Sequence, residues 1–223
     1  ACECTAWLPQ PVGNLHLQDF TEILSSKVRK QLQDSVTDGT YRYCNEHRCA
    51  YIKNHKFDVS FDLSKVKFIR MAIDDSCNLQ CPSCRTKKIF HHKGKIFKRR
   101  MSLAKKMLSY IDSTDNPFVV TIGSDGDPFA SLIYRYLLKN LPKRKDLKLN
   151  LQTNGLLLKK FMQRNTHLFE NLDTLNISVD GATKSTYEKL RIGGKWENLL
   201  ENLEYVSGIK EKFKVFLHMV VQN

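Results

Sequence analysis

The sequence predicts an α/β fold, with a parallel sheet and its helices preceded by a small cysteine-rich module. Two observations support this prediction. From Lys65 onward, short apolar runs rich in β-branched residues alternate with stretches whose apolar residues recur at helical spacing. Before that point, four of the seven cysteines flank one helical stretch. The 223 residues suffice for a medium domain plus a small one, so we expect a module over residues 1–60 and an α/β domain over residues 61–223.

The N-terminal module is expected to be held together by its cysteines. A turn-rich stretch follows Cys2 and Cys4, a helix is predicted from about residue 17 to 35, and Cys44 and Cys49 come after it. Four thiols at the two ends of one helical stretch could converge on a single metal centre, which often stabilises a region too small for a good core. Zinc and iron–sulfur centres use the same ligands, so the residues leave both open.

Five strands are predicted in the second region, and helical patterns lie between them. The strands are expected at residues 66–73, 118–122, 147–151, 175–179 and 215–221. The helices are expected near residues 102–111, 128–141, 156–165 and 196–212. Repeated βα units of this kind imply a parallel sheet buried on both faces. Ligands of such folds bind beyond the carboxyl ends of the strands, so the site is expected in the loops there.

The loop after the first strand reads D-D-S-C-N-L-Q-C-P-S-C-R and contains the strongest chemical signal. Cys77, Cys81 and Cys84 are spaced C-x3-C-x2-C, so three thiolates of one short loop could bind three corners of one cluster. No fourth cysteine lies nearby, and a [4Fe-4S] cluster here would keep one iron open for chemistry. The competing interpretation is a structural zinc site that uses Cys81 and Cys84 with His91 or His92.

This spacing and its setting resemble the radical S-adenosylmethionine (SAM) superfamily over most of residues 60–223. The resemblance implies a partial (β/α)6 radical SAM barrel, truncated at its C-terminal end, with one more helix and strand expected after Asn223. It also implies that the open iron binds the amino and carboxylate groups of SAM. A reduced cluster would then cleave SAM to a 5′-deoxyadenosyl radical that abstracts hydrogen from a substrate. One residue departs from the family pattern, since Ser83 stands where an aromatic residue is usual.

The same resemblance implies SAM contacts at later strand ends. Gly126 and Asp127 align with the family's G-G-E-P segment, whose backbone and acid receive the SAM ammonium group. A turn that leads into a helix explains the same two residues structurally. Ser178 is implied to hydrogen-bond the ribose, and Arg191 to pair with the SAM carboxylate, for which a guanidinium fork is well shaped. Asp180 either joins this cofactor-binding set or caps a turn.

A second resemblance covers residues 1 to 50, which look like a SPASM or twitch module. The pattern is C-x-C, then W-x-P-x-x-x-G-N-L, a helix, and G-x-Y-x-Y-C-x4-C. It implies an auxiliary [4Fe-4S] cluster bound by Cys2, Cys4, Cys44 and Cys49. Such modules normally follow the radical SAM domain, whereas this one precedes it. We therefore expect the chain to begin partway through a module.

Composition and charge narrow the classes of function. No run of eighteen apolar residues and no leader-like N-terminus occur, which predicts neither a membrane span nor a secretory signal. Seven cysteines without an export signal indicate a reducing, cytoplasmic compartment. The net charge is +13, and residues 85–100 contain eight Lys or Arg and no acid. Such a run is typical of a solvated loop, but it could also bind RNA phosphates.

Together these features predict a radical SAM enzyme that takes electrons from a reductant such as flavodoxin or ferredoxin. SPASM and twitch relatives mostly modify peptides, proteins or small molecules, so the expected substrate belongs to one of these classes. An RNA-modifying radical SAM enzyme is the first alternative. A non-catalytic, zinc-stabilised module that binds nucleic acid is the second.

Overall fold

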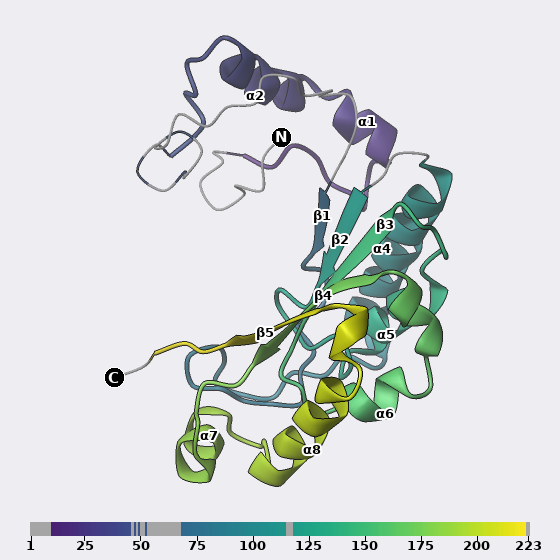
Figure 1. Cartoon of the computed structure of the whole chain (residues 1–223). Helices are drawn as coiled ribbons and strands as arrows, with labels where there is room; N and C mark the ends of the chain where they lie inside the picture. Colours follow the sequence, from purple (N-terminus) through teal and green to yellow (C-terminus); the bar gives the residue numbers. More distant parts are fainter. Residues whose placement is uncertain are drawn as a thin grey trace. The chain divides into compact units, whose positions relative to one another are not determined.

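The computed structural model describes residues 10–45, 47, 49, 52, 68–114 and 118–221. The chain divides into two compact units, Ala1–Val66 and Lys67–Asn223 (Figure 1). No helix among the described residues is both long enough and apolar enough to cross a bilayer.

In its described part, the first unit contains the short helices α1 (Phe20–Leu24) and α2 (Lys27–Thr37). The single helix expected over residues 17–35 was therefore wrong. Asp19 caps the start of α1, and the Ser26 side chain caps the start of α2. Inside a helix a serine side chain competes with the helical hydrogen bonds, whereas at a helix start it stabilises the helix. The first helix therefore ends before Ser26, and a second helix begins after it.

The second unit is built on one sheet of five parallel strands, in the order β1-β2-β3-β4-β5. The strands are β1 (Phe68–Met71), β2 (Phe118–Ile122), β3 (Leu147–Thr153), β4 (Leu172–Ser178) and β5 (Lys214–His218). The predicted α/β class and the five parallel strands are thus confirmed. Because all four strand pairs are parallel, all five carboxyl ends lie at the same edge of the sheet.

Helices connect these strands. They are α4 (Gly94–Ser113), α5 (Leu132–Asn140), α6 (Leu158–Met162), α7 (Lys184–Leu190) and α8 (Trp196–Ser207), with 3-10 turns η1 (Thr166–Glu170) and η2 (Lys210–Lys212). The largest difference from the prediction is α4, which begins eight residues before the expected start at residue 102. The helix expected from residue 128 begins only at Leu132, because the Ser131 side chain accepts the Tyr134 N–H and caps it there.

The two faces of the sheet differ in polarity. Along β3, Leu147, Leu149 and Leu151 are buried, whereas Lys148 and Gln152 are exposed. Helices α4, α5, α6 and α8 lie on one side of the sheet (Figure 1). The expectation of a sheet buried on both faces was therefore wrong for the described residues. Side chains alternate between faces along a strand, so one face is apolar and packed while the other presents polar groups.

Candidate functional site

Two loops at the carboxyl edge of the sheet are joined by main-chain contacts. The loop after β1 contains the three cysteines, and the loop after β2 reads G-S-D-G-D-P. The Asp127 N–H donates to the Ser76 carbonyl at 2.9 Å. A Cβ at Gly126 would lie 2.6 Å from the Ser76 oxygen and 2.7 Å from the Asp74 oxygen, so only glycine permits this approach. Gly126 thus lies directly against the cysteine loop.

The sulfurs of Cys77 and Cys81 both accept N–H groups. Cys77 Sγ accepts the Leu79 N–H at 3.4 Å and the Asn154 side-chain amide at 3.7 Å. Cys81 is buried, and its Sγ accepts the Arg191 guanidinium at 3.7 Å. Burial raises the pKa of both thiols, although Arg191 opposes the rise at Cys81. Metal binding requires thiolates, so a bound metal would displace protons that burial retains.

Cys84 differs because it is exposed. Its Sγ accepts the guanidinium of the next residue, Arg85, at 3.5 Å. Each of the three cysteine sulfurs therefore has a nitrogen donor of its own. Such donors stabilise sulfur that bears negative charge, as it does when it ligates a metal.

The described residues do not form the competing zinc site of two cysteines and a histidine. Among the described residues, Asp74, Asp75 and His91 form the one group of three possible ligands whose ligand atoms all lie within 4.8 Å of one another. His91 is already paired with Asp75 at 2.9 Å, and no such group joins Cys81 and Cys84 to a histidine in the described ranges. The sulfurs that bind an iron–sulfur cube stand farther apart than the ligands of one ion, as its irons occupy separate corners.

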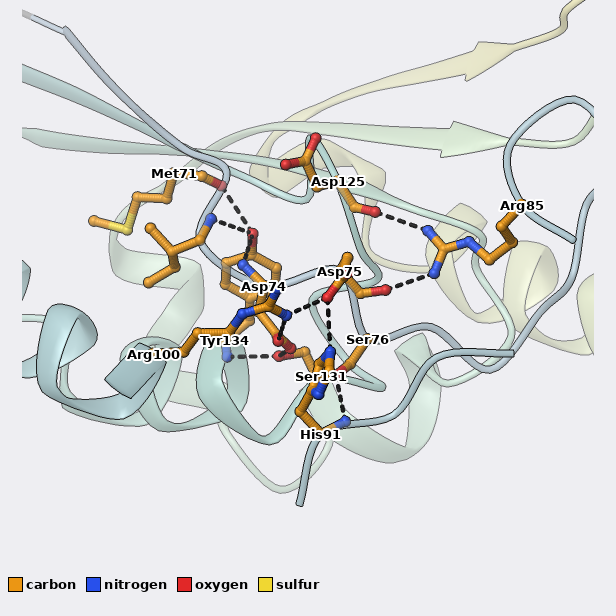
Figure 2. Close-up of polar contacts among 11 residues, drawn as sticks. Met71, Asp74, Asp75, Ser76, Arg85, His91, Arg100, Asp125, Ser131 and Tyr134 are labelled. Carbon is orange, nitrogen blue, oxygen red and sulfur yellow. Dashed lines mark hydrogen bonds and ion pairs between the residues drawn. The ribbon is translucent and has the colours of Figure 1, made fainter. Parts of the chain in front are cut away.

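A partly buried ion-pair network anchors the start of the cysteine loop (Figure 2). The Asp74 carboxylate is buried and accepts hydrogen bonds from Ser131 Oγ at 2.6 Å and from Arg100 at 2.7 Å. Arg100 also pairs with Asp75, whose carboxylate contacts His91 Nε2 at 2.9 Å. Three members of the segment 85–100, Arg85, His91 and Arg100, are thus used inside the domain. For Arg100 and His91 the partners are the carboxylates of the acid pair just before the first cysteine, whereas Arg85 donates to main-chain carbonyls.

Tyr134 of α5 fixes the end of β1 against the same network (Figure 2). Its hydroxyl accepts the N–H groups of Ile73 and Asp74, both at 3.1 Å, and donates to the Met71 carbonyl at 3.1 Å. Burial raises the pKa of Tyr134 to about 12, so the hydroxyl stays protonated and keeps its donor. The strand end that leads into the cysteine loop is therefore firmly held.

Asp127 is buried, and both of its carboxylate oxygens are used inside the protein. One oxygen accepts the N–H groups of Phe129 and Ala130, both at 3.0 Å. The other accepts the Thr153 hydroxyl at 2.7 Å and the Asn154 N–H at 2.9 Å. Asp127 thus ties the loop after β2 to the end of β3, and its carboxylate has no free oxygen directed at a ligand.

Arg191 and Asp180 form a largely buried ion pair at 2.7 Å, with 12% and 3% of their side chains exposed. The second Asp180 oxygen accepts the Val220 N–H at 2.9 Å. Arg191 Nε is buried and has no hydrogen-bond partner among the described residues. Ser178 is the last residue of β4 and lies beside His218 of β5 in the sheet register. The structure therefore places Asp180, Arg191 and Ser178 at the same edge of the sheet as the cysteine loop.

The four cysteines assigned to an auxiliary cluster are only partly described. Cys2 and Cys4 lie outside the described residues. Cys44 and Cys49 belong to the first unit, where both are half-buried. Cys44 lines a recess of ≈ 470 Å³ together with Gly39, Thr40, Tyr41, Asn45, His47 and Ile52.

The sequence is similar to one protein family and to several known proteins. The family described as "Radical SAM superfamily" matches residues 72–222. The chain is 24% identical over 140 residues to a probable GTP 3′,8-cyclase of Methanococcus maripaludis, with 63% of this chain and 45% of that protein covered. It is 28% identical over 159 residues to a GTP 3′,8-cyclase of Aliarcobacter butzleri, with 68% and 46% covered. The aligned part thus spans less than half of either relative.

Solved structures show a more distant likeness. BtrN in complex with AdoMet and 2-DOIA is 18% identical, with a TM-score of 0.45 and coverage of 69% of this chain and 58% of that one. Native anSMEcpe with bound AdoMet and Cp18Cys peptide is 21% identical, with a TM-score of 0.42 and coverage of 67% of this chain and 42% of that one.

Proposed function

The chain belongs to the radical SAM superfamily, and from this premise we propose that it binds a [4Fe-4S] cluster through Cys77, Cys81 and Cys84 and cleaves SAM reductively. When bound, the cluster would supply the electron that splits SAM to a 5′-deoxyadenosyl radical, which abstracts hydrogen from a substrate. The observation that supports this proposal most is the set of three sulfurs, each with a nitrogen donor, in one loop at the carboxyl edge of the sheet.

The SAM amino acid moiety would be held by Arg191 and by the loop that contains Gly126. Arg191 Nε lacks a partner among the described residues, and its ion pair with Asp180 fixes the direction of the guanidinium. A fixed guanidinium binds a carboxylate well. Asp127 has no free carboxylate oxygen, so the main-chain carbonyls of its loop would accept the SAM ammonium. We retain Ser178 as the donor to the ribose.

The polar side chains on the uncovered face of the sheet favour a polar substrate. Thr121, Asn150 and Thr174 stand side by side on neighbouring strands. Asn150 Oδ1 is buried without a hydrogen-bond partner among the described residues, and a buried polar atom of this kind is costly unless a ligand or water satisfies it. Amides and hydroxyls in such a row suit small molecules or peptides with hydrogen-bonding groups. Because two relatives are named GTP 3′,8-cyclase, a nucleotide is among the small molecules to be tested as substrates.

RNA modification is the second candidate. Lys87, Lys88, Lys93 and Lys95 are exposed, so part of the basic segment can bind phosphates.

For the electron we propose a soluble reductant such as flavodoxin or ferredoxin. For the first unit we propose an auxiliary cluster bound by its four cysteines.

The proposal is tested by anaerobic reconstitution with iron and sulfide, followed by incubation with SAM and dithionite. We expect 5′-deoxyadenosine to form, and we expect Arg191→Ala to raise the KM for SAM at least tenfold through the loss of the carboxylate contact. The control is Lys189→Ala, which removes an exposed cation two residues away and should leave the KM unchanged. A protein with a full complement of iron that forms no 5′-deoxyadenosine would contradict the proposal.

A further inference from the structure

Arg85 joins three parts of the candidate site, although the family resemblance implies no role for it. One terminal nitrogen of its guanidinium donates to the Asp75 carbonyl at 2.5 Å, and the other donates to the Asp125 carbonyl at 2.8 Å. The second nitrogen also reaches Cys84 Sγ at 3.5 Å. Figure 2 shows the guanidinium between the two carbonyls. The side chain therefore links the loop after β1, the loop after β2 and the third cysteine.

This guanidinium is fixed and charged. Arginine is protonated at any working pH, so a permanent positive charge lies at hydrogen-bond distance from a sulfur of the site. Two carbonyl acceptors on different loops keep the guanidinium in place. The charge cannot leave the sulfur without the loss of these hydrogen bonds.

We propose that Arg85 is a positioning residue that raises the reduction potential of the cluster by holding its positive charge at Cys84. This inference rests on the proposed function, since it requires a cluster on the three cysteines. When one electron arrives from an external reductant, the cluster becomes more negative by one charge. A nearby cation and an N–H donor to sulfur both stabilise the reduced form more than the oxidised form.

A purely mechanical role for Arg85 makes a different prediction. If the side chain only tied the two loops together, its removal would lower the stability of the protein but leave the potential of an assembled cluster unchanged. The residue must therefore be replaced in ways that separate its charge from its hydrogen bonds. Arg85→Lys keeps the charge but loses the pair of terminal nitrogen donors. Arg85→Gln keeps an N–H donor but loses the charge, and Arg85→Met loses both the charge and the donors.

The experiment is an anaerobic redox titration with dithionite, followed by electron paramagnetic resonance, on the reconstituted full chain and on each variant. We expect Arg85→Gln and Arg85→Met to lower the ratio of reduced to oxidised cluster at a fixed potential about tenfold, which is a shift of 59 mV for one electron. Arg85→Lys is expected to stay closer to the unsubstituted protein. Lys87→Met removes an exposed charge two residues away and should not shift the potential.

Iron content and thermal stability are measured on the same samples, so that only variants with an assembled cluster are compared. Arg85→Gln is the more conservative replacement and provides the comparison if Arg85→Met does not bind iron. A neutral variant whose cluster titrates at the same potential as the unsubstituted protein would overturn the inference. By contrast, failure of the unsubstituted protein to assemble any cluster at the three cysteines would refute the proposed function.

Discussion

Asp127 shows at the scale of one residue how a predicted ligand contact can be a structural one. Its carboxylate accepts four hydrogen bonds, two at the start of the segment that leads into α5 and two at the end of β3. Each bond to a buried carboxylate stabilises the fold more than a bond between neutral groups does. The residue therefore shapes the loop next to the cysteines without facing a ligand itself.

Asp127→Asn is expected to lower the free energy of unfolding by about 2 kcal/mol, because an amide offers one acceptor oxygen and turns an N–H donor toward other donors. The measurement is urea denaturation of the apo protein. Asp125→Asn neutralises an exposed acid in the same loop and serves as the control, with no change expected beyond about 0.5 kcal/mol. Equal stabilities of the two variants would show that the four bonds contribute nothing.

The pH dependence of stability should report the pairing of Asp75. Burial alone would raise the pKa of Asp75, but the hydrogen bond and charge of Arg100 outweigh it and hold the pKa below its usual range. A carboxyl whose folded-state pKa is lowered stabilises the fold above the unfolded-state pKa of about 3.9, and this contribution is lost as the pH falls through the folded-state pKa. Asp75→Asn should therefore destabilise the apo protein at pH 7, and the difference should shrink below about pH 4. A difference independent of pH would exclude this ion pair as its cause.

The site residues differ in how well the sequence predicted them. Cys77, Cys81 and Cys84 were predictable because their spacing alone places three thiols in one loop. The inward roles of Arg85 and Arg100 were not predictable, because their partners lie on other loops and only the fold brings them together. Within a basic run, a cation paired inside the domain looks the same as one in solvent.

At the scale of elements, α4 shows where periodicity reasoning fails. Its first two turns are rich in Lys and Arg, which the helix dipole disfavours at this end, and no side chain caps the helix at Lys93. The apolar periodicity therefore predicts a helix that starts only near residue 102. The contacts of Arg100 with Asp74 and Asp75 explain why the helix nevertheless extends toward the cysteine loop.

The start of α4 depends on Gly94, whose φ of +84° is costly for any residue with a side chain. A Cβ at this position would meet no atom within 4 Å, so a substitution is affected by backbone strain alone. Gly94→Ala is expected to lower the free energy of unfolding by about 1 kcal/mol in urea denaturation. The control is Gly208→Ala at the end of α8, where φ is −71° and alanine should be neutral or slightly stabilising. A stabilised Gly94→Ala variant would contradict the strained start.

At the scale of the whole molecule, the βα rhythm predicted the number of the strands and their parallel direction. It did not predict that one face of the sheet would be polar. The signal lies in β3, where L-K-L-N-L-Q-T alternates between apolar and polar residues, whereas the strands of parallel sheets are usually buried on both faces. The exception is consistent with a ligand-binding surface, because enzymes depart from packing rules at functional sites.

The central claim, that three cysteines of one loop bind a cluster that binds SAM, is tested most directly by electron paramagnetic resonance with iron analysis. The unsubstituted protein is compared with the triple variant in which Cys77, Cys81 and Cys84 are replaced by alanine. We predict that the variant loses about four irons per chain, together with a dithionite-reduced signal whose shape changes when SAM is added. An unchanged iron content and signal in the variant, or stoichiometric zinc without a reducible signal in the unsubstituted protein, would contradict the claim.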